Sequence, residues 1–512
     1  MHIIFITPAS ALRRFPVYRL GSRFYGHPNA ITGPLILGGI LKKAGHTVEV
    51  YEELNGKLPL WKCLEKADVF SIYTMTSTAP RAYELADIIH ACSDAKVIIG
   101  GIHASALPEE AAKYADHVIV GEGESVILDV VEGRLTDKII RSVTPEDLDA
   151  LPLPDYSILK TPCDSANVMT TRGCTYRCTF CTTSRMFAPY RQRSVDSVID
   201  EIRTYKTMGF RYMNFEDDNF TADKERAKEI CRRMIAENLI FKETFFFGRT
   251  DMAEDEELMS LLEQAHLNRV LIGIESLNET ALEQIHKGQH RDDIVRAAKA
   301  CREHKIRLIA SIVLGIDADS SEDIRKVVRF ARDLDAYQLQ PAILTPYPGT
   351  PVYQQFQDEN RMLVPDWEQY DMMNVTFEPR NMSAWELQNE FYYAVTFFYD
   401  IFSSFRIGKI FGWGYMVRRL GLAFFARAGA FGARFAADHA GQTFYYKLKH
   451  EIYETEKART VPVLYLLKQK PAAVNVHSSE NIPSDGIPDE QPDNYQPSWE
   501  ARQLAGQLIY RP

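Results

Sequence analysis

The stretch Gly173-Cys174-Thr-Tyr-Arg-Cys178-Thr-Phe180-Cys181 places three cysteines within eight residues, at the spacing CxxxCxxC. Thiolates in one short loop can bind a single metal centre, but zinc sites and fully ligated iron–sulfur clusters require a fourth ligand. Three thiolates would leave one iron of a four-iron cluster open to another molecule. Two alternatives remain, namely Cys163 as a fourth ligand and three core cysteines that are close by chance. The remaining cysteines are scattered singly: Cys63, Cys92, Cys231 and Cys301.

Short apolar runs alternate with helical patterns on the carboxyl side of this loop. The clearest helical pattern is Val195, Val198, Ile199 and Ile202, which ends before Gly209. Six strand–helix units are fewer than the eight of a complete barrel. We therefore predict a partial (βα)6 barrel of the TIM type over residues 166–390. Its expected strands are 168–171, 212–215, 244–248, 270–274, 308–314 and 339–345.

The same alternation occupies the first 145 residues. Short runs rich in β-branched residues, separated by helices, predict a parallel sheet of the Rossmann or flavodoxin type. Ligands of such sheets bind at the carboxyl ends of the strands, which here carry 74–78, 100–103 and 121–124. The expected strands are 3–6, 48–51, 69–73, 97–99 and 118–120, and the expected helices are 33–44, 79–92 and 109–115. Residues 146–165, with Pro152 and Pro154, are predicted to be an extended linker.

A helical region is predicted over residues 391–470, and its segment 401–450 is basic and aromatic. Such a segment can lie on an anionic membrane surface, or it can pack against the barrel with its arginines in water. Glycines at 408, 412, 414, 421, 429 and 432 should weaken any long continuous helix. The segment has one acid, Asp438, and eight basic residues: Arg406, Lys409, Arg418, Arg419, Arg427, Arg434, Lys447 and Lys449. Residues 471–512 are expected to be a largely disordered acidic, proline-rich tail.

The overall composition limits the class of protein. A chain of 512 residues should hold two to four domains, and its net charge of -10 argues against nucleic acid as a partner. Eight cysteines are too few for a disulfide scaffold. No apolar run is long enough to span a membrane, and the first residues favour a strand over a signal peptide. We expect a cytoplasmic protein.

The CxxxCxxC loop at the start of a βα barrel, with Phe180 between its last two cysteines, resembles the radical S-adenosylmethionine (SAM) superfamily. The resemblance implies that Cys174, Cys178 and Cys181 hold a [4Fe–4S] cluster whose open iron binds SAM. Reductive cleavage of SAM would then give a 5′-deoxyadenosyl radical. The electron would come from a donor of the flavodoxin or ferredoxin type.

Other motifs match this superfamily position by position. The resemblance implies that Phe180 borders SAM and that Glu216-Asp217-Asp218, after the second barrel strand, binds its amino group; which of the three does so stays open. Glu275, at the end of the fourth strand, would lie near the ribose, and Arg191 or Arg193 would pair with the SAM carboxylate. The acids are alternatively helix caps, and the arginines alternatively solvated surface residues.

The runs Gly100-Gly101-Ile-His103-Ala-Ser105 and Val120-Gly121-Glu-Gly123-Glu124 resemble the cobalamin-binding domain of one radical SAM branch. The resemblance implies that cobalamin lies against Thr76, Ser77, Gly100, Gly101, His103, Gly121 and Gly123. His103 would meet the nucleotide tail. The sequence has no Asp-x-His-x-x-Gly motif, so cobalt is expected to lack a histidine ligand from the protein. A degenerate domain that no longer binds the cofactor is the alternative.

These resemblances imply a cobalamin-dependent radical SAM enzyme that methylates an unactivated carbon of a small or lipid-like substrate. The same motifs serve oxidative cyclisation or carbon–carbon coupling in lipid, tetrapyrrole or natural-product biosynthesis. A non-catalytic cobalamin-binding sensor is an alternative of another class, disfavoured by the intact cysteine triplet. Methylthiotransferases are disfavoured because their N-terminal domain needs three further cluster cysteines, whereas this one has only Cys63 and Cys92.

Overall fold

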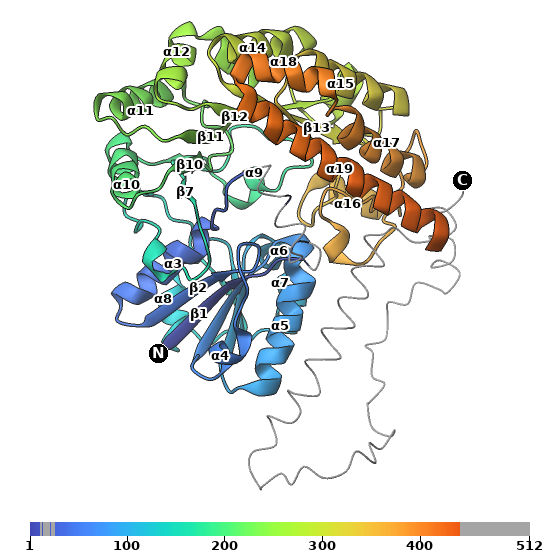
Figure 1. The fold of residues 1–512 in the computed structure, drawn as a ribbon. Helices are drawn as coiled ribbons and strands as arrows, with labels where there is room; N and C mark the ends of the chain where they lie inside the picture. Colours follow the sequence, from blue (N-terminus) through green and yellow to red (C-terminus); the bar gives the residue numbers. More distant parts are fainter. Residues whose placement is uncertain (11–12, 14–20, 22–25, 441–512) are drawn as a thin grey trace, which may run out of the picture.

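The computed structural model describes residues 1–10, 13, 21 and 26–440, with side chains up to residue 430. Two six-stranded parallel sheets lie one beyond the other along the molecule, and helices cover them (Figure 1). The predicted α/β class with two successive sheet domains is confirmed. The predictions for 441–470 and for the tail 471–512 lie outside the described residues.

The first sheet has the strand order β2-β1-β3-β4-β5-β6. Its first five positions follow the flavodoxin order, as the sequence predicted. Strand β6 and the short helix at 102–106 were not predicted, and the expected helix 109–115 is shorter and spans Pro108–Ala111. The strands are β1 His2–Thr7, β2 Thr47–Glu52, β3 Val69–Tyr73, β4 Lys96–Gly100, β5 His117–Val120 and β6 Ile139–Arg141. The helices are α3 Thr32–Lys43, α4 Leu60–Leu64, η1 Thr76–Thr78, α5 Ala79–Cys92, α6 Ile102–Ala106, α7 Pro108–Ala111, η2 Gly123–Ser125 and α8 Ile127–Val131.

The second sheet has the order β14-β13-β12-β11-β10-β7. Its edge strands β7 and β14 do not pair with each other, so the predicted partial barrel is confirmed. The strands are β7 Ser165–Val168, β10 Tyr212–Phe215, β11 Glu243–Gly248, β12 Arg269–Glu275, β13 Arg307–Leu314 and β14 Gln338–Ile343. The helices are α10 Val195–Thr207, α11 Lys224–Ala236, η4 Thr250–Glu254, α12 Glu256–Gln264, α13 Glu279–Gln284, α14 Arg291–Glu303, α15 Ser321–Asp333, α16 Pro351–Asp358 and η5 Trp367–Gln369.

The helix α10 illustrates why these residues form their elements. Ser194 caps its start by accepting a hydrogen bond from the backbone N–H of Ser197, and Gly209 follows its end at φ 86°. Val198, Ile199 and Ile202 of the apolar stripe predicted from the sequence are fully buried in the core, and Val195 is partly buried against it. Burial of that stripe, more than intrinsic propensity, stabilises the helix against the sheet.

The chain between the two sheets departs from the predicted extended linker. It contains a short helical turn, η3 Tyr156–Ile158, and the N–H of Lys160 donates to the carbonyl of Val50 at 2.9 Å. After β7 the backbone forms an antiparallel pair of β8 Thr171–Arg172 with β9 Arg191–Gln192, which encloses the cysteine loop and α9 Thr183–Met186. Strand β7 therefore ends three residues before the predicted strand 168–171 does.

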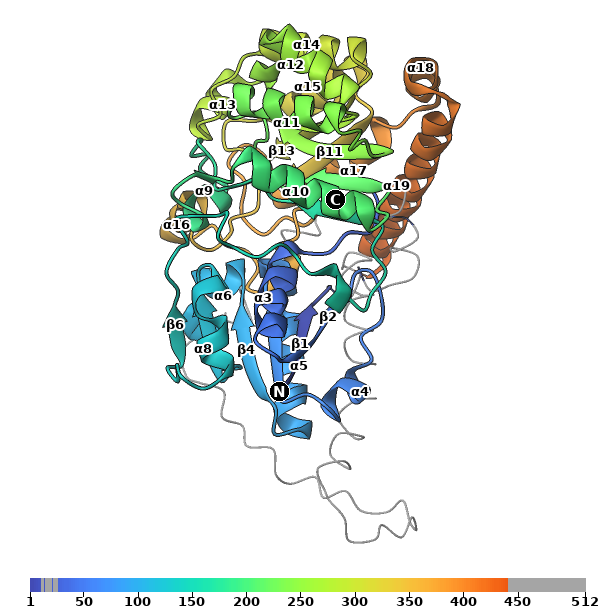
Figure 2. The same ribbon diagram turned by 90° about the vertical axis from the view of Figure 1, so that its left-hand side faces the viewer.

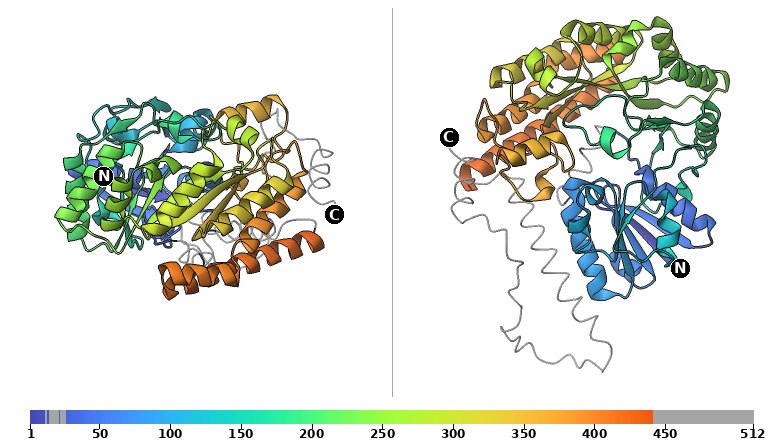
Figure 3. Two further views of the ribbon diagram at one scale, coloured as in Figure 1. Left: turned by 90° about the horizontal axis from the view of Figure 1, so that it is seen from above. Right: turned by 180° about the vertical axis from the view of Figure 1, so that it is seen from behind.

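The C-terminal helices are α17 Ala384–Phe397, α18 Ile401–Phe411 and α19 Trp413–Ala440. Helix α19 runs along the side of the barrel (Figures 2 and 3). Gly412, at φ 110°, separates α18 from α19, but α19 continues over 28 residues despite its own glycines. The predicted weakening of a long helix is therefore wrong here. Packing against α17 and α18 outweighs the loss of helix stability, which is about 1 kcal/mol per glycine. No helix of the described residues is long and apolar enough to cross a membrane.

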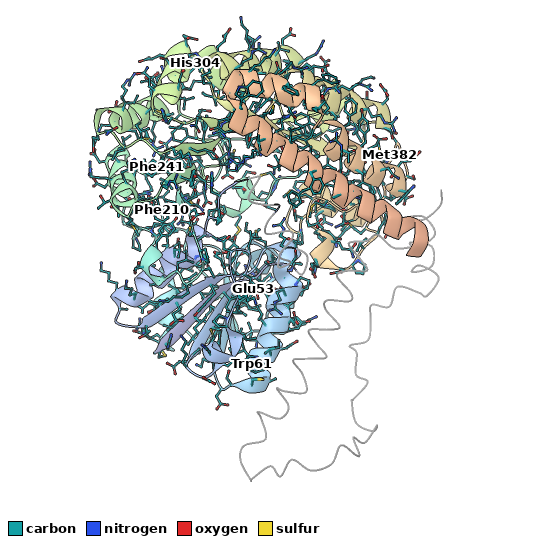
Figure 4. All side chains as sticks on the ribbon, in the orientation of Figure 1. Glu53, Trp61, Phe210, Phe241, His304 and Met382 are labelled. Carbon is teal, nitrogen blue, oxygen red and sulfur yellow. The ribbon has the colours of Figure 1, made fainter. Side chains whose placement is uncertain are left out.

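The carboxyl ends of both sheets face the junction between them. Glu53 follows β2 and lies at the end of the first sheet nearest the barrel, whereas Trp61 lies at the far end of that domain (Figure 4). Thr32, at the start of α3, donates to Glu216 after β10 over 2.6 Å. The loops expected to bind two different cofactors therefore meet at one junction.

Candidate functional site

The cysteine loop begins at Gly173, whose φ of 84° is in the left-handed region. A Cβ there would lie 2.5 Å from the carbonyl oxygen of Phe187, so only glycine fits. Cys178 is buried, and its Sγ lies 4.0 Å from the carbonyl oxygen of His286. Among the described residues no three His, Cys, Asp or Glu side chains converge on one point.

Burial raises the pKa of the Cys174 and Cys178 thiols, and the positive charges of Lys287 and Arg249 oppose this at Cys178. Arg249, which follows β11, stacks 3.7 Å above the ring of Tyr176 in the loop. Its guanidinium also donates to the carbonyl of Lys287 at 2.7 Å. Two cationic side chains thus flank a loop of three thiols, and positive charge stabilises thiolates and an anionic cluster.

Cys163 differs from these three. Its thiol donates to the carbonyl of Ser165 at 3.2 Å, and burial raises its pKa to about 12. A role for Cys163 as the fourth ligand stays a prediction.

Glu275 ends β12 at φ 61°, where the register with β13 shifts. Lys287 Nζ donates to its Oε1 at 2.7 Å, whereas Oε2 is buried without a hydrogen-bond partner in the described structure. A Cβ on Gly273 would lie 2.1 Å from Glu275 Oε1, so the glycine makes room for the carboxylate. A buried acceptor beside the cysteine loop fits the hydroxyl groups of a bound ribose.

The three acids after β10 have different surroundings. Asp217 accepts from the backbone N–H of Thr170 at 2.6 Å and of Thr171 at 2.9 Å, so its carboxylate joins the strand end to the hairpin. Glu216 accepts from Asn167 and Thr32, and burial raises its pKa to about 7. Burial also raises the pKa of Asp218 to about 7, and this carboxyl lies within electrostatic reach of Cys174. Of the three acids, Asp218 is the one whose charge acts on the Cys174 thiol, and which of them would bind the SAM amino group stays a prediction.

Arg191 and Arg193 both have protein partners. Arg191 Nη2 contacts Glu122 Oε1 at 2.5 Å, and Arg193 pairs with Glu201. Arg172 also pairs with Glu122 and, at 2.6 Å, with Glu124. Pairing of either Arg191 or Arg193 with the SAM carboxylate stays a prediction. The sequence did not predict the buried cluster of Glu122 with Arg172 and Arg191. In the run Gly121–Glu124, only the two glycines had been selected as cofactor contacts.

At the carboxyl end of the first sheet, two of the predicted contact residues have a backbone conformation that requires glycine. Gly101 has φ 103°, and a Cβ on it would lie 2.6 Å from the carbonyl oxygen of Thr74. Gly121 has φ 93°, and its Cβ would lie 2.7 Å from Ser142 Oγ. The other expected contacts lie at the same sheet edge: Thr76 and Ser77 in η1, Gly100 at the end of β4 and Gly123 at the start of η2.

His103 lies in α6 and is completely buried. Its Nε2 lies 3.3 Å from Glu110 Oε1, and its ring meets the ring of Trp367 edge-on at 5.3 Å. Trp367 Nε1 donates to the other oxygen of Glu110 at 3.1 Å, which joins η5 to the first domain. His103 Nδ1 is buried without a partner among the described residues. Glu110 and Trp367 thus hold His103 inside the domain, which favours the alternative of a core histidine, and its contact with the nucleotide tail stays a prediction.

A cavity of about 320 Å³ lies inside the barrel, within the size range of ligand sites. Its wall comes from five neighbouring strands and is closed on one side by residues between β1 and α3. The lining residues are Gly26, His27, Asn29, Asn214, Glu216, Phe245, Phe247, Arg269, Ile309, Gln338 and Gln340.

Comparison with known families and structures agrees with this geometry. Residues 22–131 match the B12 binding domain, and residues 168–331 match the radical SAM superfamily. The bacteriochlorophyllide d C-12(1)-methyltransferase of Chlorobaculum tepidum is 27% identical over 340 residues, covering 63% of this chain and 73% of that protein. The anaerobic magnesium-protoporphyrin IX monomethyl ester cyclase of Cereibacter sphaeroides is 24% identical over 393 residues, covering 69% and 64%.

Among solved structures, the cobalamin-dependent SAM radical enzyme OxsB, with aqua-cobalamin and SAM bound, superposes with a TM-score of 0.61 at 14% identity. The match covers 92% of this chain and 79% of OxsB, and it shows the shared fold. The order of a B12-binding domain, a radical SAM domain and a helical C-terminal region is thus common to both chains.

Proposed function

We propose that this radical SAM enzyme, whose chain joins a B12-binding domain to a radical SAM domain, methylates an unactivated carbon of a small or lipid-like substrate. The observation that carries the proposal is the barrel cavity. Residues 26–29 of the N-terminal region and Glu216 of the barrel both line it, and Glu216 is hydrogen-bonded to Thr32 of the first domain. A substrate in this cavity lies at the junction of the two cofactor-binding parts.

The [4Fe–4S] cluster, when bound, supplies the electron that cleaves SAM, and cobalamin supplies a carrier for the methyl group. Cys174, Cys178 and Cys181 hold the iron. Asp218 and Glu275 accept hydrogen bonds from the SAM amino group and ribose. Phe245, Phe247 and Ile309 exclude water from the cavity and fix the substrate, so that a reactive radical meets only the intended hydrogen.

A second candidate reaction is oxidative cyclisation, and the similarity to the magnesium-protoporphyrin cyclase of Cereibacter sphaeroides favours it. It would use the same cysteines and cavity but would need no methyl carrier. A non-catalytic cobalamin-binding sensor would need neither the thiols nor the barrel cavity.

The test uses anaerobically reconstituted protein, expressed with cobalamin and incubated with SAM and a reductant. Methylation predicts both 5′-deoxyadenosine and S-adenosylhomocysteine among the products, because two SAM molecules serve different roles. A cyclase would give 5′-deoxyadenosine alone, and a sensor would give neither. Exchange of Cys174, Cys178 and Cys181 for alanine should abolish iron binding and cleavage. The matched control Cys163→Ala should retain both, and loss of iron in that control would contradict a cluster held by three thiolates.

The chain is proposed to divide at the limits predicted from its sequence: a B12-binding domain at 1–145, a connecting segment with a helical turn at 146–165, a barrel at 166–390 and a helical region from 391. The predicted end of that region at 470 and the predicted tail 471–512 lie outside the described residues. None of the eight cysteines, all of which are described, forms a disulfide. This supports a cytoplasmic location, where a flavodoxin or ferredoxin-type protein would reduce the cluster.

Peripheral contact with an anionic membrane is proposed through one face of α18 and α19. Phe402 is 77% exposed and Phe424 69% exposed, and both are large apolar side chains. Trp413, Val417 and Phe424 recur at helical spacing, so they share one face of α19. Lys409 and Arg427 are exposed on the same two helices. Exposed aromatic and basic side chains together suit the interface of an anionic bilayer.

A further inference from the structure

A short chain of hydrogen-bonded amides lies between the barrel cavity and the first domain. It starts at Asn167 of β7, which is completely buried. Asn167 Nδ2 donates to the carbonyl oxygen of Ala30 at 2.7 Å and to Glu216 Oε1 at 2.6 Å. A backbone carbonyl oxygen can only accept, so the Asn167 atom that faces Ala30 is the nitrogen. The orientation of the Asn167 amide is thereby fixed, and its Oδ1 is the atom left for other partners.

Asn214 lies beside Asn167 on the neighbouring strand β10. The Nδ2 of Asn214 donates to Asn167 Oδ1 at 2.8 Å. The Asn214 atom at this contact is the nitrogen, because Asn167 Oδ1 has no proton to donate. Asn29 approaches the same oxygen at 3.5 Å, which is too long to fix its amide in the same way. The hydrogen bonds therefore fix the amide of Asn214 with its nitrogen towards Asn167.

The amide oxygen of Asn214 is the atom that this arrangement leaves to the cavity. Asn214 is half-buried and lines the cavity, and its Oδ1 accepts no hydrogen bond from the described residues. Gln340 of β14 also lines the cavity, but no hydrogen bond in the described part of the chain fixes its amide, so it can donate or accept. Asn214 Oδ1 can only accept, and inside a cavity its donor has to come from water or from a ligand.

An apolar layer lies next to Asn214 along the strands. Phe245 of β11 is level with Asn214, and both line the cavity. Phe247 comes two residues later, about 7 Å nearer the carboxyl ends, and Ile309 of β13 is level with it. The rings of Phe245 and Phe247 meet edge-on with their centres 4.9 Å apart. A ligand held at Asn214 would therefore extend through this apolar layer towards the carboxyl ends of the strands.

We propose that an N–H or O–H group of the substrate donates a hydrogen bond to Asn214 Oδ1. The apolar body of the substrate then contacts Phe247 and Ile309. Because the fixed amide of Asn214 cannot turn to present a donor, a substrate without such a group leaves this oxygen unpaired and is rejected. The reacting carbon lies on the order of 10 Å from the donor group, at the carboxyl ends of the strands. That position rests on the proposed function, whereas the donor site rests on the hydrogen bonds and the cavity alone.

The test uses ligand-observed NMR with the reconstituted protein and two pairs of probes. The first pair is 3-phenylpropionamide and its N,N-dimethyl derivative, and the second is 3-phenylpropan-1-ol and its methyl ether. At least one donor should bind about five times more tightly than its methylated partner, and the larger ratio identifies N–H or O–H.

Three variants locate the donor site. Asn214→Leu should abolish the preference but bind the methylated probes as the wild type does, which shows that the cavity is intact. Asn214→Ser should keep part of the preference, because its hydroxyl oxygen can still accept. The matched control is Asn389→Leu, at a half-buried asparagine of α17 whose amide donates to the carbonyl of Trp385. This control should behave as the wild type.

Equal binding of each donor and its methylated partner by the wild type would overturn the proposal, as would a preference that is undiminished in Asn214→Leu. If Asn214→Leu binds no probe at all, Asn214→Ser decides, and an undiminished ratio in that variant overturns the proposal. Formation of 5′-deoxyadenosine without substrate is measured in parallel on the wild type. SAM cleavage without a donor preference would reject the donor site alone, and a donor preference without SAM cleavage would reject the proposed function alone.

Discussion

Two buried carboxyl groups from different domains meet at the junction. Glu52 ends β2 and accepts from the N–H of Ile31 at 2.9 Å, and burial raises its pKa to about 8. Burial raises the pKa of Glu216 to about 7. Between the ordinary pKa of a glutamate and these values, the folded protein keeps protons that the unfolded chain has lost. The contribution of these two groups to stability is therefore full below about pH 4.5 and declines as the pH rises towards 8.

We predict that Glu52→Gln makes the protein more stable than the wild type at pH 8 and reduces the pH dependence of its stability. Each such carboxyl changes the unfolding free energy by about 1.4 kcal/mol per pH unit in that range. Denaturation midpoints at pH 5.5 and pH 8 measure the effect. Glu49→Gln is the control, because the pKa of Glu49 is lowered by its contact with Lys66 despite burial. An unchanged difference between the two midpoints in Glu52→Gln would contradict the prediction.

Residue spacing indicated the cysteine loop, whereas Glu275 and the glycines at the sheet edge were selected by their resemblance to known motifs. All of them depend on local patterns. The roles of single polar side chains were harder to predict. Asp217 was selected as a cofactor contact, yet its oxygens accept the N–H groups of Thr170 and Thr171. Nothing in the sequence indicated a partner for Arg269. Its partner Glu243 is distant in the sequence, and only the sheet brings the two side chains together.

The β8–β9 hairpin is the element that joins the cysteine loop to the first domain. Its Arg172 and Arg191 both contact Glu122, and all three side chains are buried. Removal of the carboxylate charge leaves two buried guanidinium groups with less compensation, which costs about 3–5 kcal/mol. We predict that Glu122→Gln lowers the denaturation midpoint and increases hydrogen exchange over residues 171–192. Glu132→Gln, at an exposed contact with Arg134, should change neither. Normal protection of the hairpin in Glu122→Gln would show that it is held by other contacts.

Elements with a clear apolar pattern were predicted better than very short ones, although the continuous 28 residues of α19 were not expected. Helix α5 occupies the predicted residues 79–92, because its apolar spacing and its proline at the start agree. Strands β6, β8 and β9 have two or three residues each and no apolar run, so periodicity could not reveal them. The end of β7 was misplaced because the Asp217 carboxylate, distant in sequence, takes the N–H groups that would continue the strand.

At the scale of the whole molecule, charge and exposed apolar area are unevenly distributed. The net charge is -10, yet the described part of the 401–450 segment carries basic side chains and exposed aromatics on α18 and α19. Some of its arginines are structural, since Arg419 is fully buried and donates to the carbonyls of Ala336 and Phe398. The sequence left two alternatives for this region, membrane contact or packing against the barrel with its arginines in water. Packing against the barrel is observed, but Arg419 is buried and does not lie in water. Its outer face remains for the proposed membrane contact.

We predict that the full chain co-sediments with vesicles containing phosphatidylglycerol and not with pure phosphatidylcholine vesicles. Combined Phe402→Ser, Trp413→Ser and Phe424→Ser should reduce the bound fraction at least tenfold, because each side chain would bury apolar area worth about 1.5–3 kcal/mol if fully inserted. Added salt should weaken binding, since anionic lipids attract Lys409 and Arg427. Trp61→Ser is the matched control, because Trp61 is exposed at the opposite end of the first domain. If Trp61→Ser lowered binding as much as the triple change, or if neutral vesicles bound equally well, the α18–α19 face would not be the contact surface.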